Sequence, residues 1–447
     1  MNADPLIPTD VDLWFLPLGG CGEIGMNMSL YGHDGRWLMV DCGIGFDRDA
    51  VNTRIITAMP DFIAARRDAL VGLLITHAHE DHVGAVASHW RELRCPVFCT
   101  RFTAQILSRK LEEAGLLGVT PVHLIETGER LDLAPFNVEW LALTHSTPES
   151  QALVIRTGAG TVFHTGDWKL DLDPVVGAPF DPRRLRDLGK QGVTAMVCDS
   201  TNATVPGRSP SEGALFRALR ERVEAATGRV VVACFGSNVA RLTTLARVAS
   251  ATQRYPALLG RSLNNYYRAA RSAGLWQLDQ TMVPSAHLGY LPAPEVLAIA
   301  TGSQGERGAA LTRLAARDHP DLDLEPQDTV IFSSRVIPGN EEALWRLDTQ
   351  LKAMGIHVVH DIDGEPPIHA SGHPARDELR DMYGWIQPWI AVPVHGEARH
   401  LDAHAELARQ LGVPVQLNGR NGDLYRLAPQ PGIRRGAATV GRLELRR

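Results

Sequence analysis

The chain has 447 residues but lacks a long apolar run, a segment of low complexity and an apolar leader. Its apolar runs are too short to cross a bilayer, which excludes a membrane-spanning protein and argues against a membrane partner. The segment 1–10 contains Asp4, two prolines and no basic residue, so a secretory signal peptide is not expected either. We therefore expect the protein to lie in the cytoplasm.

Cysteine is also scarce. The six cysteines are scattered among strand-like segments, and their spacing matches neither a disulfide framework nor a thiolate metal site. Cys95 and Cys99 are close enough in sequence to share a metal, but packed thiols in a reducing compartment are the preferred interpretation. We therefore assign the cysteines no chemistry. They are Cys21, Cys42, Cys95, Cys99, Cys198 and Cys234.

An excess of basic residues is missing as well. The chain has 45 Lys and Arg against 51 Asp and Glu, for a formal net charge of −6. This balance argues against a generally basic nucleic-acid binder, although not against a local basic groove. The arginine-rich segment 432–447 is interpreted as a solvated tail. With 44% hydrophobic and 21% charged residues the composition is that of a globular protein, and the length predicts two domains.

What the chain does have is a dense group of metal-ligating side chains. The run His77-Ala78-His79-Glu80-Asp81-His82 directly follows the apolar, strand-like segment 71–76. Imidazole and carboxylate are the usual ligands of a catalytic divalent metal. Residues two apart on an extended segment point the same way, so His77 and His79 can share one ion. Asp81 and His82 lie past the turn and can face a second ion, so the spacing predicts two adjacent metals.

Three more turns that follow strand-like segments supply the remaining donors. They carry His145, Asp167 and His395. A carboxylate has two oxygens and can bridge two ions, whereas an imidazole cannot do so and keep its ring geometry. The seven predicted ligands thus form two triplets joined by one carboxylate: His77, His79 and His145 at one ion, Asp81, His82 and His395 at the other, and Asp167 between them.

The rhythm of strands and helices divides the chain into three parts. Residues 1–208 show short strands separated by Gly-rich turns, which favours two packed sheets with a site along one edge. Residues 209–365 alternate strand and helix, which predicts a parallel sheet. The first helix of this part is expected over 211–226, capped by Ser-Pro-Ser-Glu. Residues 366–447 carry His395, so the middle part is expected to be inserted into the first domain.

The ligand motif resembles that of the metallo-β-lactamase fold, and several other segments resemble bacterial ribonuclease J, within the β-CASP branch of that fold. These segments are Gly19–Gly25, His145–Ser150, Cys198–Ala203, Thr301–Glu306, Ser371–His373 and Pro393–Glu397. The resemblance covers residues 12–427 and implies an α/β fold, a metallo-β-lactamase αββα sandwich with an inserted β-CASP domain. It also implies that Asp199, His373 and His395 are the three β-CASP motif positions. A histidine at the last position goes with RNA-processing members of the branch.

The predicted function is hydrolysis of RNA phosphodiester bonds, in RNA decay or processing. Two divalent ions about 3.5–4 Å apart clamp a phosphodiester and make hydroxide available at neutral pH. Histidine and carboxylate ligands suit zinc, with manganese as the alternative. We expect Asp81, Asp199 and His373 to be catalytic. His373 is the candidate donor of a proton to the departing 3′-oxygen, because it lies in a turn outside the ligand set.

A phosphate site is predicted where Gly/Ser turns lead into helices. Pro374 fits the first position of a helix running to about Trp385, and exposed N–H groups at a helix start bind phosphate. A seat there for a 5′-monophosphate would make the enzyme a 5′→3′ exonuclease on single-stranded RNA, whereas an open channel would allow endonuclease cuts. Simple helix capping is the alternative. The predicted substrate-binding residues are Gly302, Ser303, Ser371, Gly372 and His373.

Three other functions stay open from the sequence. A β-CASP DNA nuclease is disfavoured by His395, and a small-molecule esterase of the same fold is disfavoured by the inserted domain. A non-catalytic partner in an RNA-degrading assembly is disfavoured by the complete ligand set. Ribonuclease J proteins commonly continue into a C-terminal domain linked to self-association, whereas this chain stops at Arg447. We therefore expect a weakened homodimer and contacts with RNA-degradation partners.

Overall fold

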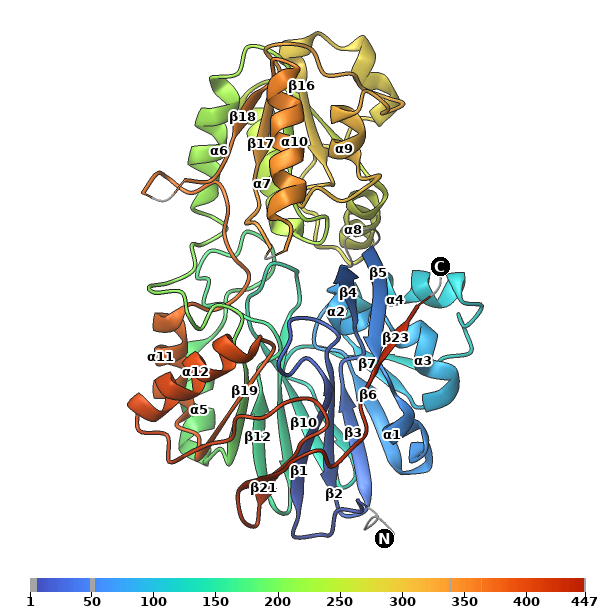
Figure 1. Cartoon of the computed structure of the whole chain (residues 1–447), viewed down its shortest axis with the longest axis vertical. Helices are drawn as coiled ribbons and strands as arrows, with labels where there is room; N and C mark the ends of the chain where they lie inside the picture. Colours follow the sequence, from blue (N-terminus) through green and yellow to red (C-terminus); the bar gives the residue numbers. More distant parts are fainter. Residues whose placement is uncertain (1–5, 49–52, 338, 363, 446–447) are drawn as a thin grey trace.

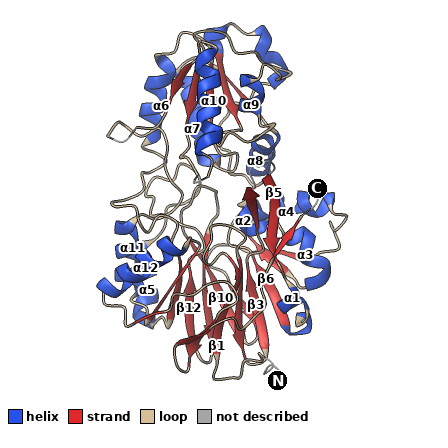
Figure 2. Ribbon diagram, viewed as in Figure 1, coloured by secondary structure: helices blue, strands red, loops and turns tan. Residues whose placement is uncertain are grey.

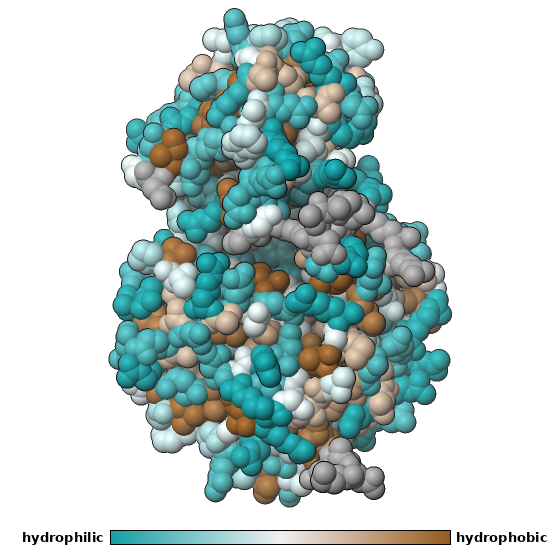
Figure 3. Space-filling model, in the orientation of Figure 1, coloured by the Kyte–Doolittle hydropathy of each residue, from teal (hydrophilic) through white to brown (hydrophobic). Residues whose placement is uncertain are grey.

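Two lobes make up the molecule (Figure 1). The computed structural model describes residues 6–48, 53–337, 339–362 and 364–445. The larger lobe is built from the first and last parts of the chain, and the smaller one from the middle. In the space-filling view the molecule narrows between the lobes, and hydrophilic side chains dominate the visible face (Figure 3).

One sheet of the larger lobe has eight strands in the order β22-β21-β1-β2-β3-β6-β7-β8. All seven residues of β1 are buried because both faces of this sheet are covered. Phe15 faces a core between the two large sheets, while its neighbour Trp14 faces a core beneath outer helices. The strands are β1 (Leu13–Gly19), β2 (Met28–His33), β3 (Arg36–Val40), β6 (Leu70–Leu74), β7 (Val97–Cys99), β8 (Val122–Leu124), β21 (Leu424–Ala428) and β22 (Gly432–Arg434).

The second sheet has seven strands in the order β20-β19-β13-β12-β11-β10-β9. Strand β19 comes from the last part of the chain and pairs in parallel with β13, which makes the middle part an insertion. The strands are β9 (Arg130–Leu133), β10 (Phe136–Ala142), β11 (Gln151–Thr157), β12 (Gly160–His164), β13 (Ala195–Asp199), β19 (Ile390–Val394) and β20 (Val415–Gln416). A small third sheet contains β4 (Ile44–Arg48), β5 (Thr53–Ala58) and β23 (Arg442–Glu444).

Helices cover the outer face of each large sheet (Figure 2). The eight-stranded sheet is covered by α1 (Asp61–Ala64), α3 (Val86–Leu93) and α4 (Arg101–Glu113). The seven-stranded sheet is covered by α5 (Pro182–Gln191), α11 (Arg376–Ile386) and α12 (Ala398–Gln410). The lobe is therefore an αββα sandwich. Two short helices, α2 (Glu80–Val83) and the 3₁₀ turn Arg67–Ala69, lie in its loops.

The smaller lobe is a five-stranded, wholly parallel sheet in the order β15-β16-β14-β17-β18. Its strands are β14 (Val230–Ala233), β15 (Tyr255–Leu259), β16 (Val296–Ala300), β17 (Thr329–Phe332) and β18 (His357–Val359). One face packs on α6 (Leu215–Glu224), α7 (Val239–Ala251) and α8 (Arg261–Ser272), and the other on α9 (Ala310–Ala315) and α10 (Glu341–Ala353). The 3₁₀ turns Ser285–Tyr290 and Ala293–Glu295 precede β16. The parallel sheet matches the sequence prediction.

A buried polar network replaces the helix cap predicted at Ser-Pro-Ser-Glu. Helix α6 begins at Leu215 rather than at 211, and no side chain caps it. Ser211 instead donates to Asp171 at 2.6 Å. Glu212 pairs with Arg241 of α7 at 3.1 Å, and both side chains are buried. The prediction is wrong because Ser211 and Glu212 lie where the chain passes from the larger lobe to the smaller one. Ser211 bonds to Asp171 of the larger lobe, and the buried charge of Glu212 must be paired with Arg241 of the smaller lobe.

The six cysteines are all buried and unpaired, and burial raises the pKa of both Cys95 and Cys99 to about 12. This agrees with packed thiols. Among the described residues, no helix is both long and apolar enough to cross a bilayer.

Candidate metal centre

The predicted ligands lie on loops that leave the strands at one edge of the sandwich. His77 and His79 follow β6, and Asp81 and His82 lie in the short helix α2. His145 follows β10, Asp167 follows β12 and His395 follows β19. Because these strands run through the same two sheets, loops far apart in sequence meet at this edge. All seven predicted ligands are brought together, in groups whose donor atoms lie within 4.8 Å of one another.

Two donor distances in the first triplet are a little shorter than one tetrahedral ion requires. His79 Nδ1 lies 3.1 Å from His77 Nε2 and 3.0 Å from His145 Nε2. Zinc–nitrogen bonds of 2.0–2.1 Å in a tetrahedron separate two nitrogens by about 3.4 Å. Asp167 Oδ2 is 3.9 Å from Nε2 of both His77 and His145. One cation can therefore be held by these three rings with Asp167 alongside.

The second triplet gathers around the same carboxylate oxygen. Asp167 Oδ2 is 3.2 Å from His82 Nε2 and 3.3 Å from His395 Nε2. Asp81 Oδ2 is 3.6 Å from the former nitrogen and 3.7 Å from the latter. Asp167 thus lies between the two triplets, where a bridging ligand would be needed.

In four of these histidines, a hydrogen-bond partner at Nδ1, the ring nitrogen that points away from the cluster, fixes the orientation of the ring. His82 Nδ1 donates to Asp41 at 2.7 Å, and His145 Nδ1 donates to the Gly372 carbonyl at 2.6 Å. His395 Nδ1 donates to Asn27 Oδ1 at 2.9 Å. Thr76 Oγ1 gives its proton to Asp41 and so accepts from His77 Nδ1. In each ring the bond at Nδ1 turns Nε2 toward the cluster, which is how metal ligands are commonly held. At His82 the Nε2 also lies 3.0 Å from Asn27 Nδ2.

Electrostatics agree with a cation in this cluster. Burial lowers the pKa of His77 and His145 well below the usual value, so both rings are neutral as metal ligands must be. Burial also lowers the pKa of His82, but the carboxylates of Asp167 and Asp41 outweigh it and raise that pKa well above the usual value. The second triplet therefore favours a positive charge. The buried His395 Nε2 has no hydrogen-bond partner within the described part of the chain. An orphaned acceptor of this kind fits a metal ligand.

Asn27, Asp41 and Gly43 are the supporting residues that the sequence analysis missed. Asp41 follows β3 directly, the same position after a strand by which the other donors were recognised. Its φ of 61° and the φ of 51° at His395 are left-handed, and such strain clusters at functional sites. A Cβ on Gly43 would lie 1.7 Å from the Asp81 carbonyl oxygen. Gly43 is therefore required for the loop to pack against the ligand segment.

His373 and Asp199 form a pair beside the cluster. His373 Nδ1 lies 2.8 Å from Asp199 Oδ2, and Thr201 holds the other oxygen of Asp199 with its backbone N–H and its hydroxyl. Burial lowers the pKa of His373, but Asp199 outweighs it and the pKa rises to about 9. The side chain of His373 is 22% exposed, whereas that of Asp199 is inaccessible. The pair can present a protonated imidazole to a bound substrate.

The predicted phosphate-binding turn has a different local structure from the one expected. Helix α11 begins at Arg376, so Pro374 is not its first residue, and the Glu378 side chain accepts from the Ala375 N–H. The N–H groups of Arg376 and residue 377 bond the carbonyls of residues 205 and 207. The predicted free helix start is therefore wrong, because side-chain and backbone acceptors already bond those N–H groups.

Ser371 and Gly372 have contacts of their own in this turn. Ser371 Oγ accepts from Asn202 Nδ2 at 2.8 Å, which leaves the hydroxyl proton available. A Cβ on Gly372 would lie 2.7 Å from His145 Cε1, so this glycine allows its carbonyl to reach the His145 ring. Gly302 and Ser303 follow β16, where the Ser303 carbonyl accepts from Ser334. The role of these residues in binding substrate stays a prediction.

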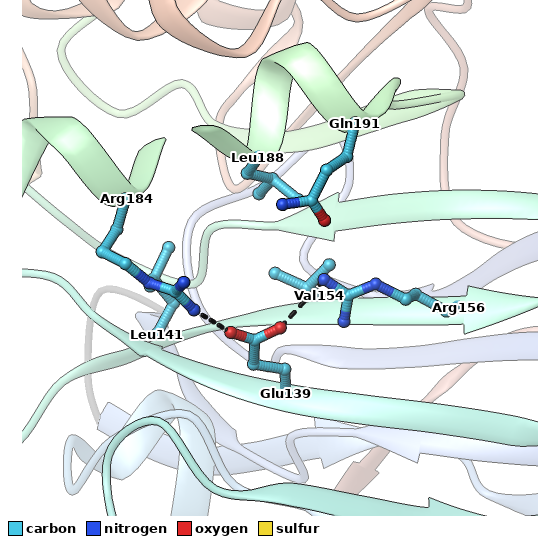
Figure 4. A pocket seen from close by; sticks show the side chains of 7 residues that line it. All are labelled: Glu139, Leu141, Val154, Arg156, Arg184, Leu188 and Gln191. Atoms are coloured by element: carbon cyan, nitrogen blue, oxygen red, sulfur yellow. Dashed lines mark hydrogen bonds and ion pairs between the residues drawn. The ribbon is translucent and has the colours of Figure 1, made fainter. Parts of the chain in front are cut away.

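A separate small pocket lies between α5 and strands β10 and β11 (Figure 4). Its centre is the buried carboxylate of Glu139, which pairs with Arg156 at 2.8 Å and with Arg184. Arg130 approaches the same carboxylate at 3.1 Å. None of the predicted site residues lines this pocket. Its paired charges indicate a structural role.

Comparison with known proteins agrees with the arrangement of both lobes. Residues 22–195 match the family model of the metallo-beta-lactamase superfamily, and residues 227–351 match that of the ribonuclease J beta-CASP domain. Residues 367–417 match the Zn-dependent metallo-hydrolase RNA specificity domain. The chain is 45% identical to ribonuclease J of Sinorhizobium meliloti over 94% of its own length and 75% of that protein. The chain belongs to the ribonuclease J family.

Two other ribonuclease J proteins are similar over nearly all of this chain. That of Mycobacterium tuberculosis is 37% identical, over 95% of this chain and 76% of its own length. That of Synechocystis is 36% identical, over 93% of this chain and 66% of its own length. A crystal structure of a protein of unknown function from Enterococcus faecalis matches 93% of this chain and 100% of its own with a TM-score of 0.62. At 13% identity it shows the fold alone. The predicted family and the predicted α/β fold are both confirmed.

Proposed function

We propose that the chain removes nucleotides in the 5′→3′ direction from single-stranded RNA that bears a 5′-monophosphate, with endonuclease cuts as a secondary activity, in RNA decay or processing. The broader statement, a metal-dependent ribonuclease, follows from its family. The observation that carries the proposal is the pair of donor triplets around Asp167. Their outer nitrogens are held by Asp41, Asn27 and Gly372.

Two divalent cations bound at these triplets would supply positive charge to the scissile phosphate and lower the pKa of the attacking water. The donor set of imidazoles and carboxylates suits zinc, and manganese accepts the same ligands. We propose zinc at both positions. Asp81 would help to hold the second ion, since its Oδ2 lies 3.6 Å from His82 Nε2 and 3.7 Å from His395 Nε2.

His373 is proposed to be the general acid. Attack of a water oxygen at phosphorus breaks the bond to the 3′-oxygen, and His373 delivers a proton to that oxygen. Asp199 keeps the imidazole protonated near neutral pH and fixes its orientation through Nδ1. The products are a nucleotide with a 3′-hydroxyl and a shortened RNA with a new 5′-monophosphate, which is again a substrate.

The proposed seat for the terminal phosphate is the Ser371 hydroxyl together with the loop of Gly302 and Ser303. Ser333 and Ser334 connect the two loops, since the Ser333 carbonyl lies 3.3 Å from His369 Nδ1 and Ser334 donates to Ser303. The N–H groups at the start of α11 are already bonded within the protein and do not contribute to this seat. Side-chain hydroxyls and loop N–H groups remain as its donors. The cytoplasmic location, a homodimer and partners in an RNA-degrading assembly stay predictions.

One RNA, prepared with a 5′-monophosphate or a 5′-triphosphate and labelled at its first nucleotide, tests the proposal. We expect labelled mononucleotide from the monophosphate form, no product from the triphosphate form, and no cleavage by His82→Ala. His287→Ala removes an exposed histidine of the smaller lobe and should leave the rate unchanged. Longer labelled fragments from both forms would establish endonuclease action instead. Intact RNA with a zinc-loaded wild-type protein would contradict the ribonuclease proposal.

A further inference from the structure

The smaller lobe makes a direct hydrogen bond to the ligand loop of the larger one. The hydroxyl of Tyr266, in α8, donates to the Ala78 carbonyl at 2.9 Å, although the two residues are 188 positions apart. Ala78 lies between His77 and His79, and it is fully buried. A buried carbonyl that loses its donor costs about 1–3 kcal/mol. The peptide that spaces the first two predicted ligands is therefore satisfied by a side chain of the inserted lobe.

Packing around this hydrogen bond keeps Tyr266 in place. Its ring centroid lies 6.2 Å from that of Phe102 in α4, and both residues belong to the same core as Ala78. Asn265, the preceding residue of α8, contacts Arg109 of α4. The two helices thus form the contact between the lobes beside the ligand loop.

Helix α4 holds the other end of the same loop. Lys110 Nζ pairs with Glu80 Oε2 at 2.7 Å, and Glu80 is the first residue of α2, which carries Asp81 and His82. The ligand segment is therefore bracketed by Tyr266 at Ala78 and by Lys110 at Glu80. A shift of α8 relative to α4 would move the Ala78 peptide and with it the rings on either side.

We infer that Tyr266 is a positioning residue, through which the inserted lobe sets the geometry of the first metal triplet. Displacement of the smaller lobe breaks this hydrogen bond and loosens the first triplet, so the metal site is complete only when the lobes are docked. This inference rests on the proposed function, because it requires metal at this site. Tyr266 is neither a predicted metal ligand, nor part of the His373–Asp199 pair, nor part of the proposed phosphate seat.

Tyr266→Phe tests the inference, since it removes the hydroxyl and keeps the ring. The matched control is Tyr267→Phe on the same helix, where the ring packs edge-on against Trp276 within the smaller lobe at 4.9 Å. Zinc affinity is measured on the metal-free proteins by competition with a chromogenic chelator. We expect Tyr266→Phe to weaken zinc binding about 10-fold, the low end of the effect of ligand-orienting partners. Tyr267→Phe should bind as the wild type does.

RNA cleavage over a range of zinc concentrations provides the second readout. Tyr266→Phe should need more zinc for half-maximal activity and recover near-wild-type turnover in excess zinc, which a general loss of folding would not allow. Unchanged zinc affinity in Tyr266→Phe, or equal weakening in both variants, would overturn the inference while the ribonuclease function stands. A wild-type protein that binds no zinc would instead overturn the proposed function, and the inference with it.

Discussion

At the scale of single residues, the metal centre depends on which nitrogen of each ring faces inward. Asp41, Asn27 and the Gly372 carbonyl each take the Nδ1 proton of one histidine and so turn its Nε2 toward the cluster. Gly372 belongs to this group through its backbone alone, and only the absence of a side chain brings that backbone within 2.6 Å of His145. Its role next to His145 is thus steric as well as polar.

Gly372→Ala should therefore impair the metal centre. The added Cβ would lie 2.7 Å from both His145 Cε1 and Ser146 Oγ, which forces the ring or the loop to move. We expect zinc affinity and RNA cleavage to fall about 10–100-fold, as for the loss of other ligand-orienting contacts. Zinc titration and cleavage rates of the purified variant measure the effect.

Gly384→Ala is the control for Gly372→Ala. Gly384 lies inside α11, and a Cβ there meets nothing within 4 Å. Alanine in a helix interior should raise the free energy of unfolding by about 1 kcal/mol, with no effect on zinc binding. Equal zinc affinity in both alanine variants would contradict the role given to Gly372.

At the scale of secondary structure elements, a buried chain of three polar side chains connects the end of β13 to two helices. Ser200 follows β13 and lies 2.8 Å from His404 Nδ1 in α12. Tyr383 in α11 lies 2.9 Å from His404 Nε2. Both ring nitrogens of His404 are thus occupied, in a place with no access to water. These contacts fix the elements that hold Asp199 and the turn before α11.

His404 should make the fold sensitive to acid. Burial lowers its pKa to about 4, below the value of about 6.5 of an unfolded histidine. As the pH falls, the unfolded state therefore binds a proton before the folded state does. The contribution of neutral His404 to the free energy of unfolding is complete above pH 6.5 and is lost as the pH falls toward 4. One such histidine lowers the free energy of unfolding by about 2 kcal/mol between pH 7 and pH 5.

Urea unfolding at pH 7 and pH 5 checks this expectation. His404→Gln should reduce the loss of stability between the two pH values by about 2 kcal/mol, while His287→Gln, at an exposed position, should leave it as in the wild type. An identical loss in His404→Gln and in the wild type would show that other groups cause the acid sensitivity.

At the scale of the whole molecule, the ligand set joins the two ends of the chain. His82 comes from the first part and His395 from the last, after the inserted lobe, and both approach Asp167 Oδ2. Asn27 is bonded to His395 across 368 positions. A cation at the second triplet would hold these segments together, and the larger lobe would depend on it for part of its stability.

Metal removal should therefore lower the melting temperature by several degrees. A ligand at 100 times its dissociation constant stabilises the folded state by about 2.7 kcal/mol per site. We expect a chelator to lower the melting temperature of the wild type and added zinc to restore it. In His82→Ala the shift should be smaller, because one triplet has lost a donor. A chelator that removes the metal without changing the melting temperature would contradict this expectation.

The sequence alone determined the ligand motif, the strand ends that carry the other donors, and the insertion of a parallel sheet between two parts of one domain. These features are local. The alternation of apolar and polar residues along a strand, or a donor residue just after an apolar run, can be recognised without knowing what packs against it. Tertiary structure alone decided which side chains support the ligands. Asn27, Asp41 and Tyr266 act on residues far along the chain, and no spacing pattern records such contacts.

Where the structure departs from the sequence predictions, the physical origin is again tertiary contact. Ser211 and Glu212 look like a helix cap in sequence, yet burial between the lobes gives them partners in Asp171 and Arg241. Pro374 looks like the first residue of a helix, yet the helix begins at Arg376, and the Glu378 side chain accepts from the N–H of its N-cap, Ala375. A favourable helix cap stabilises the fold by about 1 kcal/mol, whereas an unpaired buried charge destabilises it by several kcal/mol. The tertiary contacts therefore decide the local structure.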